Sequence, residues 1–440
     1  MRKPNQDDGG PAVNTTQSTT LTTAVLPGLE PRLLAHQRED LAAYRRLGGY
    51  RPLDGADRLL SEVESGGLAG RGGAAFPLAV KLRAVRDNGR LAGGSVVVAN
   101  GEEGEPASIK DRWLLRNRPH LVLDGLRLAA AMVAADRAYV YVSDAESARS
   151  VEAALTEHAF GDITIELINV APGYIAGEET AVTRAINGGP VKPTDKPPRP
   201  FQRGVGGRPT LVSNVETLAN LPYLHRHGSA EFRSVGTSLS VGTFLVTLTG
   251  GGRPPGLYEV PHGLPFRELL ALHGISSDQV QGALLGGYFA GLLNRVVLDA
   301  TLDHETLRGL GSGLGCGAIS VITDDCPVAV AASVLAYFDR ENAGQCGSCF
   351  NGTAAMAAVA CALRDGAATS DDLDRLRRWS VTLRGRGACA TLDAATNVAG
   401  SLLDQFPQTV ARHLDNTCES CRANVFRAER PYEVEAVVYA

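Results

Sequence analysis

The chain has 440 residues, of which 44% are hydrophobic and 21% are charged, and its net charge is −5 at pH 7. This balance excludes the basic surface that nucleic-acid binding needs. No run approaches the about 18 uncharged apolar residues of a membrane span. The length predicts several domains. We therefore expect a cytoplasmic globular protein with no nucleic-acid partner and no insertion into a membrane.

The N-terminus is polar, rich in Thr, Asn and Gln, and lacks the apolar core of a secretory signal. Its composition predicts a disordered tail over residues 1–26. Eight cysteines, several of them clustered near the C-terminus, fit a reducing cytosol with a metal site better than a disulfide framework.

Residues 67–112 contain a glycine-rich loop, and the interpretation of the rest of the chain starts from this stretch. Four glycines stand within the seven residues from Gly67 to Gly73, and because glycine loses the most backbone entropy on ordering, they predict a loop. Apolar residues at helical spacing follow Pro77, so the loop is expected at a helix N-terminus. Free N–H groups and the helix dipole favour a phosphate at such a position.

A short apolar run, Val96–Ala99, predicts a buried strand. Polar residues follow it at once, namely Asn100, Glu102, Glu103 and Glu105. Open α/β sheets bind ligands just past the carboxyl ends of their strands. The pattern therefore predicts a ligand site here.

Strands and helices then alternate. We predict helices over residues 120–134 and 145–158 and strands over residues 138–142 and 163–170, which indicates a parallel, Rossmann-like sheet. A glycine-containing turn over residues 173–180 precedes a helix that begins near Ala181, and a proline-rich loop around Lys196–Pro200 follows.

A small α+β unit is predicted after residue 242, with strands over residues 243–249 and 257–260, a helix over residues 265–273, and a strand and turn over residues 283–293. From residue 328 to about residue 414, helices with alanine-rich faces predict a helical bundle. The cysteines of this part lie at the helix ends.

Two sequence blocks carry a resemblance to a known family. Gly70-Arg71-Gly72-Gly73-Ala74-Ala75-Phe76-Pro77 with Lys81, and Asn100-Gly101-Glu102-Glu103-Gly104-Glu105-Pro106 with Lys110-Asp111-Arg112, resemble the NADH-oxidising flavoprotein subunit of bacterial respiratory complex I. The same family includes the flavin subunits of NAD-linked hydrogenases and formate dehydrogenases. The resemblance runs from about residue 60 to about residue 415. It implies an FMN- and NAD-binding α/β domain (27–238), a β-grasp, SLBB-like domain (239–325) and a helical iron–sulfur domain (326–440).

The resemblance also implies a set of cofactor-binding residues. They would hold FMN and stack NAD(P)H over it, and they are Gly70, Arg71, Gly72, Gly73, Phe76, Lys81, Asn100, Glu102, Glu103, Glu105, Tyr174, Gly177, Glu178, Glu179, Lys196, Ser213 and Asn214. Taken singly, Lys81 and Lys110 would instead be solvated surface charges, and the three glutamates would form a capped, exposed turn.

Three residues depart from the family pattern. Leu82 and Arg199 stand where the family usually has aromatic residues that sandwich the adenine, and Ser213 replaces one of a pair of Asn residues. Our hypothesis is that Arg199 compensates by pairing with a phosphate, which would shift the preference toward NADPH.

The family holds a [4Fe–4S] cluster with a C-x-x-C-x-x-C run and one distant cysteine. Cys346, Cys349 and Cys389 match three of these positions, and Ala343 stands at the fourth. The resemblance thus implies a cluster whose fourth ligand is open: a water, Asn342, or a thiolate from Cys418 or Cys421. A three-iron cluster, loss of the cluster and a zinc site remain alternatives.

The other cysteines are interpreted separately. Cys418 and Cys421 also fit an exposed redox pair, half of a zinc site, or no role, whereas Cys316, Cys326 and Cys361 are expected to be buried or incidental thiols.

The sequence therefore predicts an oxidoreductase that transfers hydride from NAD(P)H to FMN and then passes single electrons through the cluster. The acceptor would be a small iron–sulfur redox protein, ferredoxin- or thioredoxin-like, or a ferredoxin, and a larger membrane-associated complex is one setting for it. No side chain is needed as an acid or base, because hydride transfer depends on positioning. The alternative is a non-catalytic adaptor subunit that keeps the fold.

Overall fold

A computed structural model describes residues 20–35 and 38–434. Residues 1–19 of the predicted tail lie outside this part of the chain. The prediction of disorder is wrong for the residues that follow, because β1 (Thr22–Val25) pairs in parallel with β7 (Gly256–Pro261). Two threonines and a valine in four residues suit a strand, since β-branched side chains pack well on a pleated surface.

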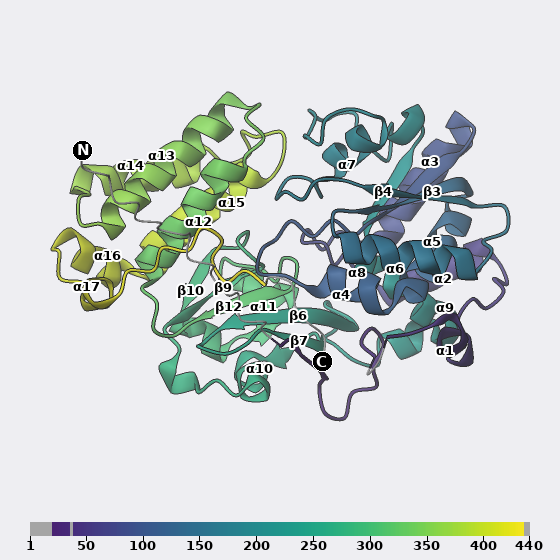
Figure 1. The fold of residues 1–440 in the computed structure, drawn as a ribbon, viewed down its shortest axis with the longest axis horizontal. Helices are drawn as coiled ribbons and strands as arrows, with labels where there is room; N and C mark the ends of the chain where they lie inside the picture. The colour runs from purple at the N-terminus through teal and green to yellow at the C-terminus, as the bar shows by residue number, and fades with distance from the viewer. Residues whose placement is uncertain (1–19, 36–37, 435–440) are drawn as a thin grey trace, which may run out of the picture.

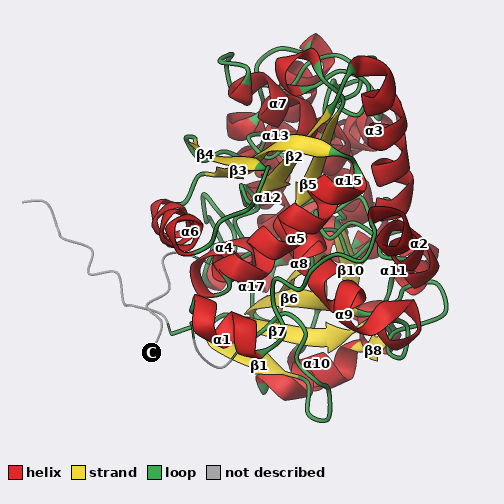
Figure 2. Cartoon of the chain, turned by 90° about the vertical axis from the view of Figure 1, so that its right-hand side faces the viewer, coloured by secondary structure: helices red, strands yellow, loops and turns green. Residues whose placement is uncertain are grey.

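The α/β domain is built on a four-stranded sheet in the order β4-β3-β2-β5, with every neighbouring pair parallel. Its strands are β2 (Ser95–Asn100), β3 (Ala135–Val142), β4 (Thr164–Asn169) and β5 (Thr210–Asn214) (Figure 2). Three were predicted from the sequence; β5, at the end of the proline-rich loop, was not. Because the strands are parallel, all their carboxyl ends meet at one edge of the sheet.

Both faces of this sheet are covered, which explains the continuous apolar run in β2. Val97 and Ala99 belong to one hydrophobic core, whereas Val96 and Val98 belong to a second core on the other face with Tyr141. Strands buried on both faces need no polar alternation. The helices of this domain are α1 (Leu41–Arg46), α2 (Ala56–Gly66), α3 (Leu78–Ala92), α4 (Lys110–Asn117), α5 (Pro119–Met132), α6 (Ala145–Glu157), α7 (Glu179–Ile186), α8 (Val215–Ala219) and α9 (Leu221–Phe232).

A second, mixed sheet follows in the order β1-β7-β6-β12-β9-β10. Its further strands are β6 (Thr243–Gly250), β9 (Gly282–Leu285), β10 (Leu292–Asn294) and β12 (Ala318–Ile322). Helices α10 (Phe266–His273) and α11 (His304–Gly309), with the short pair β8 (Leu264–Pro265) and β11 (Thr301–Leu302), complete the unit. This confirms the predicted α+β unit, with β12 as an additional strand.

The C-terminal part is helical and lies at the opposite end of the molecule from α3 and β3 (Figure 1). Its helices are α12 (Pro327–Glu341), α13 (Gly347–Arg364), α14 (Ser370–Thr382), α15 (Thr391–Gln405), α16 (Pro407–Leu414) and α17 (Glu419–Ala423). Residues 424–434, the C-terminal segment, then run back toward the α/β domain, where Val434 N donates to Pro106 O at 2.9 Å. Of the helices in the described residues, none has both the length and the apolar character for a membrane crossing.

Candidate functional site

A cavity of about 890 Å³ lies where the three structural units meet. Its volume falls in the range of about 300–1,000 Å³ that is usual for cofactor sites. All the predicted cofactor-binding residues except Arg71 line it: Gly70, Gly72, Gly73, Phe76, Lys81, Asn100, Glu102, Glu103, Glu105, Tyr174, Gly177, Glu178, Glu179, Lys196, Ser213 and Asn214. Residues scattered over 145 positions of the sequence are thus gathered at one sheet edge.

Arg71 is the exception, and its guanidinium points away from the cavity. It is buried and donates to the carbonyl oxygens of Val241 and Thr243, both at 3.1 Å, while its backbone N–H donates to Thr217 Oγ1 at 2.8 Å. The prediction that Arg71 binds the cofactor directly is therefore corrected: its side chain fastens the glycine loop to the start of the mixed sheet.

Glycines form part of the cavity wall because the chain approaches itself closely there. A Cβ atom at Gly177 would lie 2.8 Å from Glu102 Oε2, and one at Gly72 would lie 3.0 Å from the Cβ atom of Asn214. At Gly104 it would lie 2.5 Å from a backbone oxygen. Real Cβ atoms essentially never come as close to backbone as this, so Gly104 requires glycine, whereas a Cβ at Gly72 or Gly177 would need Asn214 or Glu102 to shift. The backbone itself faces the ligand space at these positions.

Glu102 is buried and Glu105 is half-buried at the cavity, and each has one buried oxygen without a partner. Glu102 Oε1 lies 3.4 Å from the N–H of Gly173 and 3.5 Å from Ser143 Oγ, and Glu105 Oε2 accepts from Tyr288 N at 2.9 Å. Glu102 Oε2 and Glu105 Oε1 have no hydrogen-bond partner within the described residues. Burial raises the pKa of both carboxyls to about 8. An ordered water or a bound ligand would complete the bonding of these two oxygens.

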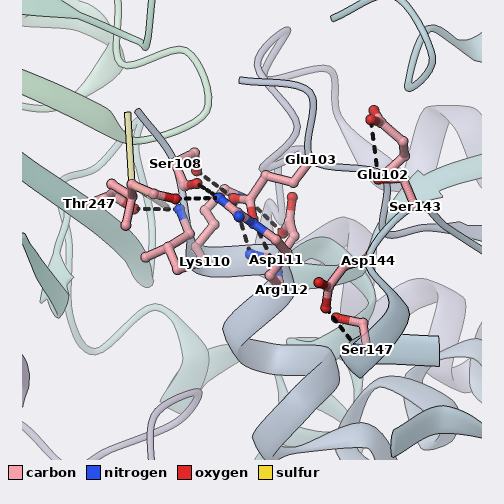
Figure 3. Close-up of polar contacts among 12 residues, drawn as sticks. Glu102, Glu103, Ser108, Lys110, Asp111, Arg112, Ser143, Asp144, Ser147 and Thr247 are labelled. Carbon is pink, nitrogen blue, oxygen red and sulfur yellow. Dashed lines mark hydrogen bonds and ion pairs between the residues drawn. The ribbon is translucent and has the colours of Figure 1, made fainter. Parts of the chain in front are cut away.

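Glu103 has a different task from its neighbours. Its carboxylate accepts from the N–H groups of Asp111 at 3.2 Å and Arg112 at 3.0 Å, at the start of α4, and Figure 3 shows this cluster with Ser108 and Lys110. A carboxylate at these N–H groups caps the helix and faces the positive end of its dipole. Although Glu103 lines the cavity, its bonding capacity is already used by α4.

Lys110 is fully buried beneath the cavity, so the interpretation of this lysine as a surface charge is wrong. Its Nζ lies 2.7 Å from Asp111 and 2.9 Å from Glu216, and Asn214 links to the same group through a 2.7 Å bond to Asp111. Burial alone would lower the pKa of Lys110. The nearby carboxylates of Asp111 and Glu216 together have the larger effect, so the pKa of the lysine is raised. The network fixes Asn214 at the cavity wall.

The rim is formed by alternating charges around Glu179. Its carboxylate lies 3.5 Å from Lys81, 3.9 Å from Lys196 and 3.4 Å from the half-exposed guanidinium of Arg199. Burial lowers the pKa of Lys81, although Glu179 opposes this, and Lys81 also donates to Val212 O at 2.7 Å. Glu178 caps α7 through Thr180 N and pairs with Lys196 at 2.5 Å.

Leu82 does not face the ligand space, which corrects its assignment to the adenine subsite. Its side chain is fully buried in the core, while Ala84 and Phe201 line the cavity with Arg199. Helical spacing alone could not decide which residue of α3 faces inward. Sequence reasoning also missed wall residues from the mixed sheet, Gly286, Phe289, Gly315 and Cys316; glycine-rich turns were the only signal for them.

Three of the cysteines surround a small hollow beside the cavity. Cys346, Cys349 and Cys389 line it together with Ala343, Gln345 and Pro193. Cys389 also lines the large cavity, so one residue borders both. The hollow has the expected three thiols, and Ala343 does face it at the missing position.

The three residues considered as a fourth ligand, Asn342, Cys418 and Cys421, each have other partners. Asn342 is occupied within its own turn, because its Nδ2 donates to Asp339 O at 2.6 Å and its Oδ1 accepts from Gly344 N at 2.9 Å. Cys418 and Cys421 gather instead with Cys326 and His413, and Cys326 is buried, as expected from the sequence. Cys418 is buried, so it is not an exposed redox group.

A cavity of cofactor size that shares a wall with a cysteine group defines a redox protein with a bound organic cofactor and a neighbouring metal centre. Comparison with known proteins gives the family. Residues 63–223 match the model of the Nuo51 FMN-binding domain, and residues 329–413 match that of the NADH-ubiquinone oxidoreductase-F iron-sulfur binding region. The chain belongs to the family of the F subunit of NADH-quinone oxidoreductase, the NADH-oxidising FMN flavoproteins with an iron–sulfur region.

Individual relatives match over most of the chain. The F 2 subunit of NADH-quinone oxidoreductase in Rhizobium meliloti (strain 1021) is 32% identical over 400 residues, covering 85% of this chain and 94% of the relative. The NADP-reducing hydrogenase subunit HndC of Solidesulfovibrio fructosivorans is 32% identical over 392 residues, covering 85% of this chain and 79% of the relative. A crystal structure of NAD⁺-reducing [NiFe]-hydrogenase in the H₂-reduced state superposes with a TM-score of 0.77 at 30% identity, covering 86% of this chain and 67% of that one.

Proposed function

We propose that this chain transfers hydride from NAD(P)H to FMN in the large cavity and passes single electrons to an iron–sulfur cluster at Cys346, Cys349 and Cys389. FMN supplies the conversion between a two-electron donor and a one-electron carrier. The observation that carries the proposal is that Cys389 borders both the cavity and the cysteine hollow. Two redox centres bound there would be neighbours without an intervening layer of protein.

The residues at the strand ends fit FMN. Gly70 and Gly72 leave the backbone of the loop before α3 open to a phosphate. Asn100 and Asn214 lie in register on the adjacent strands β2 and β5, and both line the cavity. Amide and carboxyl groups match the hydroxyl and ring polar atoms of a flavin.

Glu102 and Glu105 would act as binding and orienting groups. Because burial raises their pKa to about 8, each holds a proton at neutral pH and presents a carboxylic acid to the cavity. A neutral acid can donate to a ligand oxygen as well as accept. Holding the reactants in line is the task of the protein in hydride transfer, so neither residue needs to exchange its proton during turnover.

The cluster site is proposed as a three-thiolate site. Iron–sulfur clusters normally take four cysteines, and no side chain among the described residues lining the hollow replaces the thiolate that Ala343 lacks. We propose that the fourth iron takes a non-protein ligand. Tyr174 lines the large cavity, and its ring lies 5.2 Å from that of Phe338.

We also propose that the chain works as one subunit of a larger complex. The relatives named above are described as subunits of NADH-quinone oxidoreductase and of hydrogenase, and an electron leaving the cluster needs an acceptor. The acceptor proposed here is a small iron–sulfur protein, ferredoxin- or thioredoxin-like. All eight cysteines are free thiols, which supports a cytoplasmic location.

The proposal is tested by anaerobic titration of the purified protein with NADH and, separately, with NADPH. Flavin bleaching followed by a reduced-cluster signal in electron paramagnetic resonance is the expected result. Flavin bleaching in a sample without iron would overturn the cluster part. No bleaching by either nucleotide would overturn the enzymatic function in favour of an adaptor, an alternative that no relative supports.

A further inference from the structure

A second group of metal-binding side chains lies at the far end of the helical domain. Cys326, His413, Cys418 and Cys421 bring their sulfur and nitrogen atoms within 4.8 Å of one another, and this is the sole such group found in residues 20–35 and 38–434. Cys326 precedes α12, His413 lies in the last turn of α16, and Cys418 and Cys421 flank the start of α17. We name these four residues the corner group.

The distances in the corner group are those of a tetrahedral ion. Cys326 Sγ lies 3.8 Å from Cys418 Sγ and 3.2 Å from His413 Nε2, and Cys421 Sγ lies 3.7 Å from the same nitrogen. A tetrahedral Zn²⁺ with bonds of about 2.3 Å to sulfur and about 2.1 Å to nitrogen separates two sulfurs by about 3.8 Å and sulfur from nitrogen by about 3.6 Å. These three distances are close to the tetrahedral values, and all four ligand atoms lie within 4.8 Å of one another.

The surroundings orient the histidine for metal binding. His413 Nδ1 lies 3.0 Å from the carbonyl oxygen of Leu363, so this nitrogen carries the proton and the lone pair of Nε2 points at the three sulfurs. A backbone carbonyl in this role is the usual outer partner of a metal-bound histidine. Cys326, His413 and Cys418 are each less than 9% exposed, which gives the closed surroundings of a structural site.

Competing uses of the group fit the geometry less well. In a cubane cluster each thiolate binds a different iron, so two ligand sulfurs do not come into van der Waals contact as Cys326 and Cys418 do. A disulfide needs a sulfur–sulfur distance of about 2.05 Å, far below the 3.8 Å between these two atoms. Three thiolates and one imidazole form a common structural zinc site.

We propose that Cys326, His413, Cys418 and Cys421 bind one structural Zn²⁺. The ion would tie the start of α12 to the α16–α17 corner, two positions 92 residues apart in the chain. It would also anchor the C-terminal segment, which begins just after α17 and ends on Pro106, next to Glu105 at the flavin cavity. The zinc site would thus brace the helical domain and one wall of the cavity without taking part in electron transfer.

The test is metal counting on the full-length protein purified anaerobically, with zinc and iron measured on the same sample. We expect one zinc per chain that resists dialysis against a chelator. His413→Ala should lower the retained zinc more than about tenfold, because loss of even an outer partner weakens metal sites by about 10–100-fold. His413→Cys should keep zinc, since four thiolates also bind it tetrahedrally.

The matched control is Cys361→Ser, on α13 and outside the corner group, which should retain its zinc. Because a ligand variant can fail to fold, the wild-type chain produced with cobalt gives a second test. Tetrahedral cobalt visible bands with thiolate-to-metal charge transfer are expected. Wild-type protein without zinc, a Cys326–Cys418 disulfide in the anaerobic sample, or zinc retained by His413→Ala would each overturn the proposal. Neither flavin nor turnover enters the readout, so the proposed function is tested independently.

Discussion

The helical domain carries two groups of cysteines that differ in how they are enclosed. Cys346, Cys349 and Cys389 surround a hollow that shares Cys389 with the large cavity, and one position of that hollow is an alanine. In the corner group, Cys326 and Cys418 belong to the hydrophobic core and Cys421 packs against it, and the four ligand atoms lie within 4.8 Å of one another. We propose that the neighbours set the use of each group, because an open position suits exchange of electrons and a closed shell suits structure.

The same contrast holds for the acidic residues. Glu103 is fully bonded at the start of α4, whereas Glu102 and Glu105, beside it in sequence, each keep a free buried oxygen at the cavity. Unpaired buried groups raise the free energy of the folded state. Both of these oxygens lie at the cavity, where a ligand could supply the missing hydrogen bonds.

The largest effect is expected from removing a thiol of the open cysteine site. Cys389→Ser should remove iron, while flavin bleaching persists. NADH-driven reduction of a one-electron acceptor should fall by about 100-fold, which is the largest effect that loss of even an outer metal partner usually has. Rapid-mixing absorbance separates the two steps. Cys361→Ser is the control and should keep both. Equal loss of flavin bleaching in Cys389→Ser would contradict a division into two centres.

The next prediction concerns the unpaired carboxyls. Burial raises the pKa of Glu102 from its ordinary value of 4.5 to about 8, so between these values the folded chain holds a proton that the unfolded chain has released. Stability should therefore fall as pH rises from 5 to 8, by up to about 1.4 kcal/mol per pH unit for this group. Glu102→Gln should flatten this slope.

The measurement is urea unfolding of the cofactor-depleted protein at several pH values. The control is Glu166→Gln, which replaces a half-exposed carboxylate on β4 and should leave the slope unchanged. A wild-type stability that rises over the same window would show that the carboxyl is ionised in the folded state.

A smaller effect is expected at the rim. Arg199 is half exposed and bonds to Glu179 at 3.4 Å, so a phosphate on the ribose can compete for its guanidinium. Arg199→Phe should lower the ratio of kcat/KM for NADPH to that for NADH by about tenfold, as expected for loss of one charge-assisted hydrogen bond. Steady-state kinetics with both nucleotides measure the ratio. An unchanged ratio would remove Arg199 from dinucleotide selection.

The smallest effect is expected from adding a fourth cysteine ligand to the three-cysteine site. Ala343→Cys supplies a fourth thiol to the hollow at Cys346, Cys349 and Cys389, so the cluster should lose iron more slowly in air, while zinc content stays the same. Iron counts over time and the three-iron signal in electron paramagnetic resonance follow the change. A three-iron signal of equal size in both proteins would indicate that residue 343 does not reach the cluster.

The sequence by itself determined the family, the alternation of strands and helices, and the cavity residues that lie in short motifs. Asn100, Glu102 and Glu105 follow directly on a buried strand, so local pattern and the geometry of a parallel sheet were enough to place them together. The sequence also showed that Ala343 stands where the family has a cysteine, because this comparison depends only on the spacing of the motif.

Only the tertiary structure decided where side chains point and which distant residues meet. Arg71 stands inside the glycine motif but turns to Val241, and Leu82 sits on a cavity helix but faces the core. Cys326 reaches Cys418 across 92 positions of sequence. Such contacts depend on how whole helices and sheets pack. Packing is set by burial between residues far apart in the sequence and not by local spacing, so no sequence motif predicts these contacts.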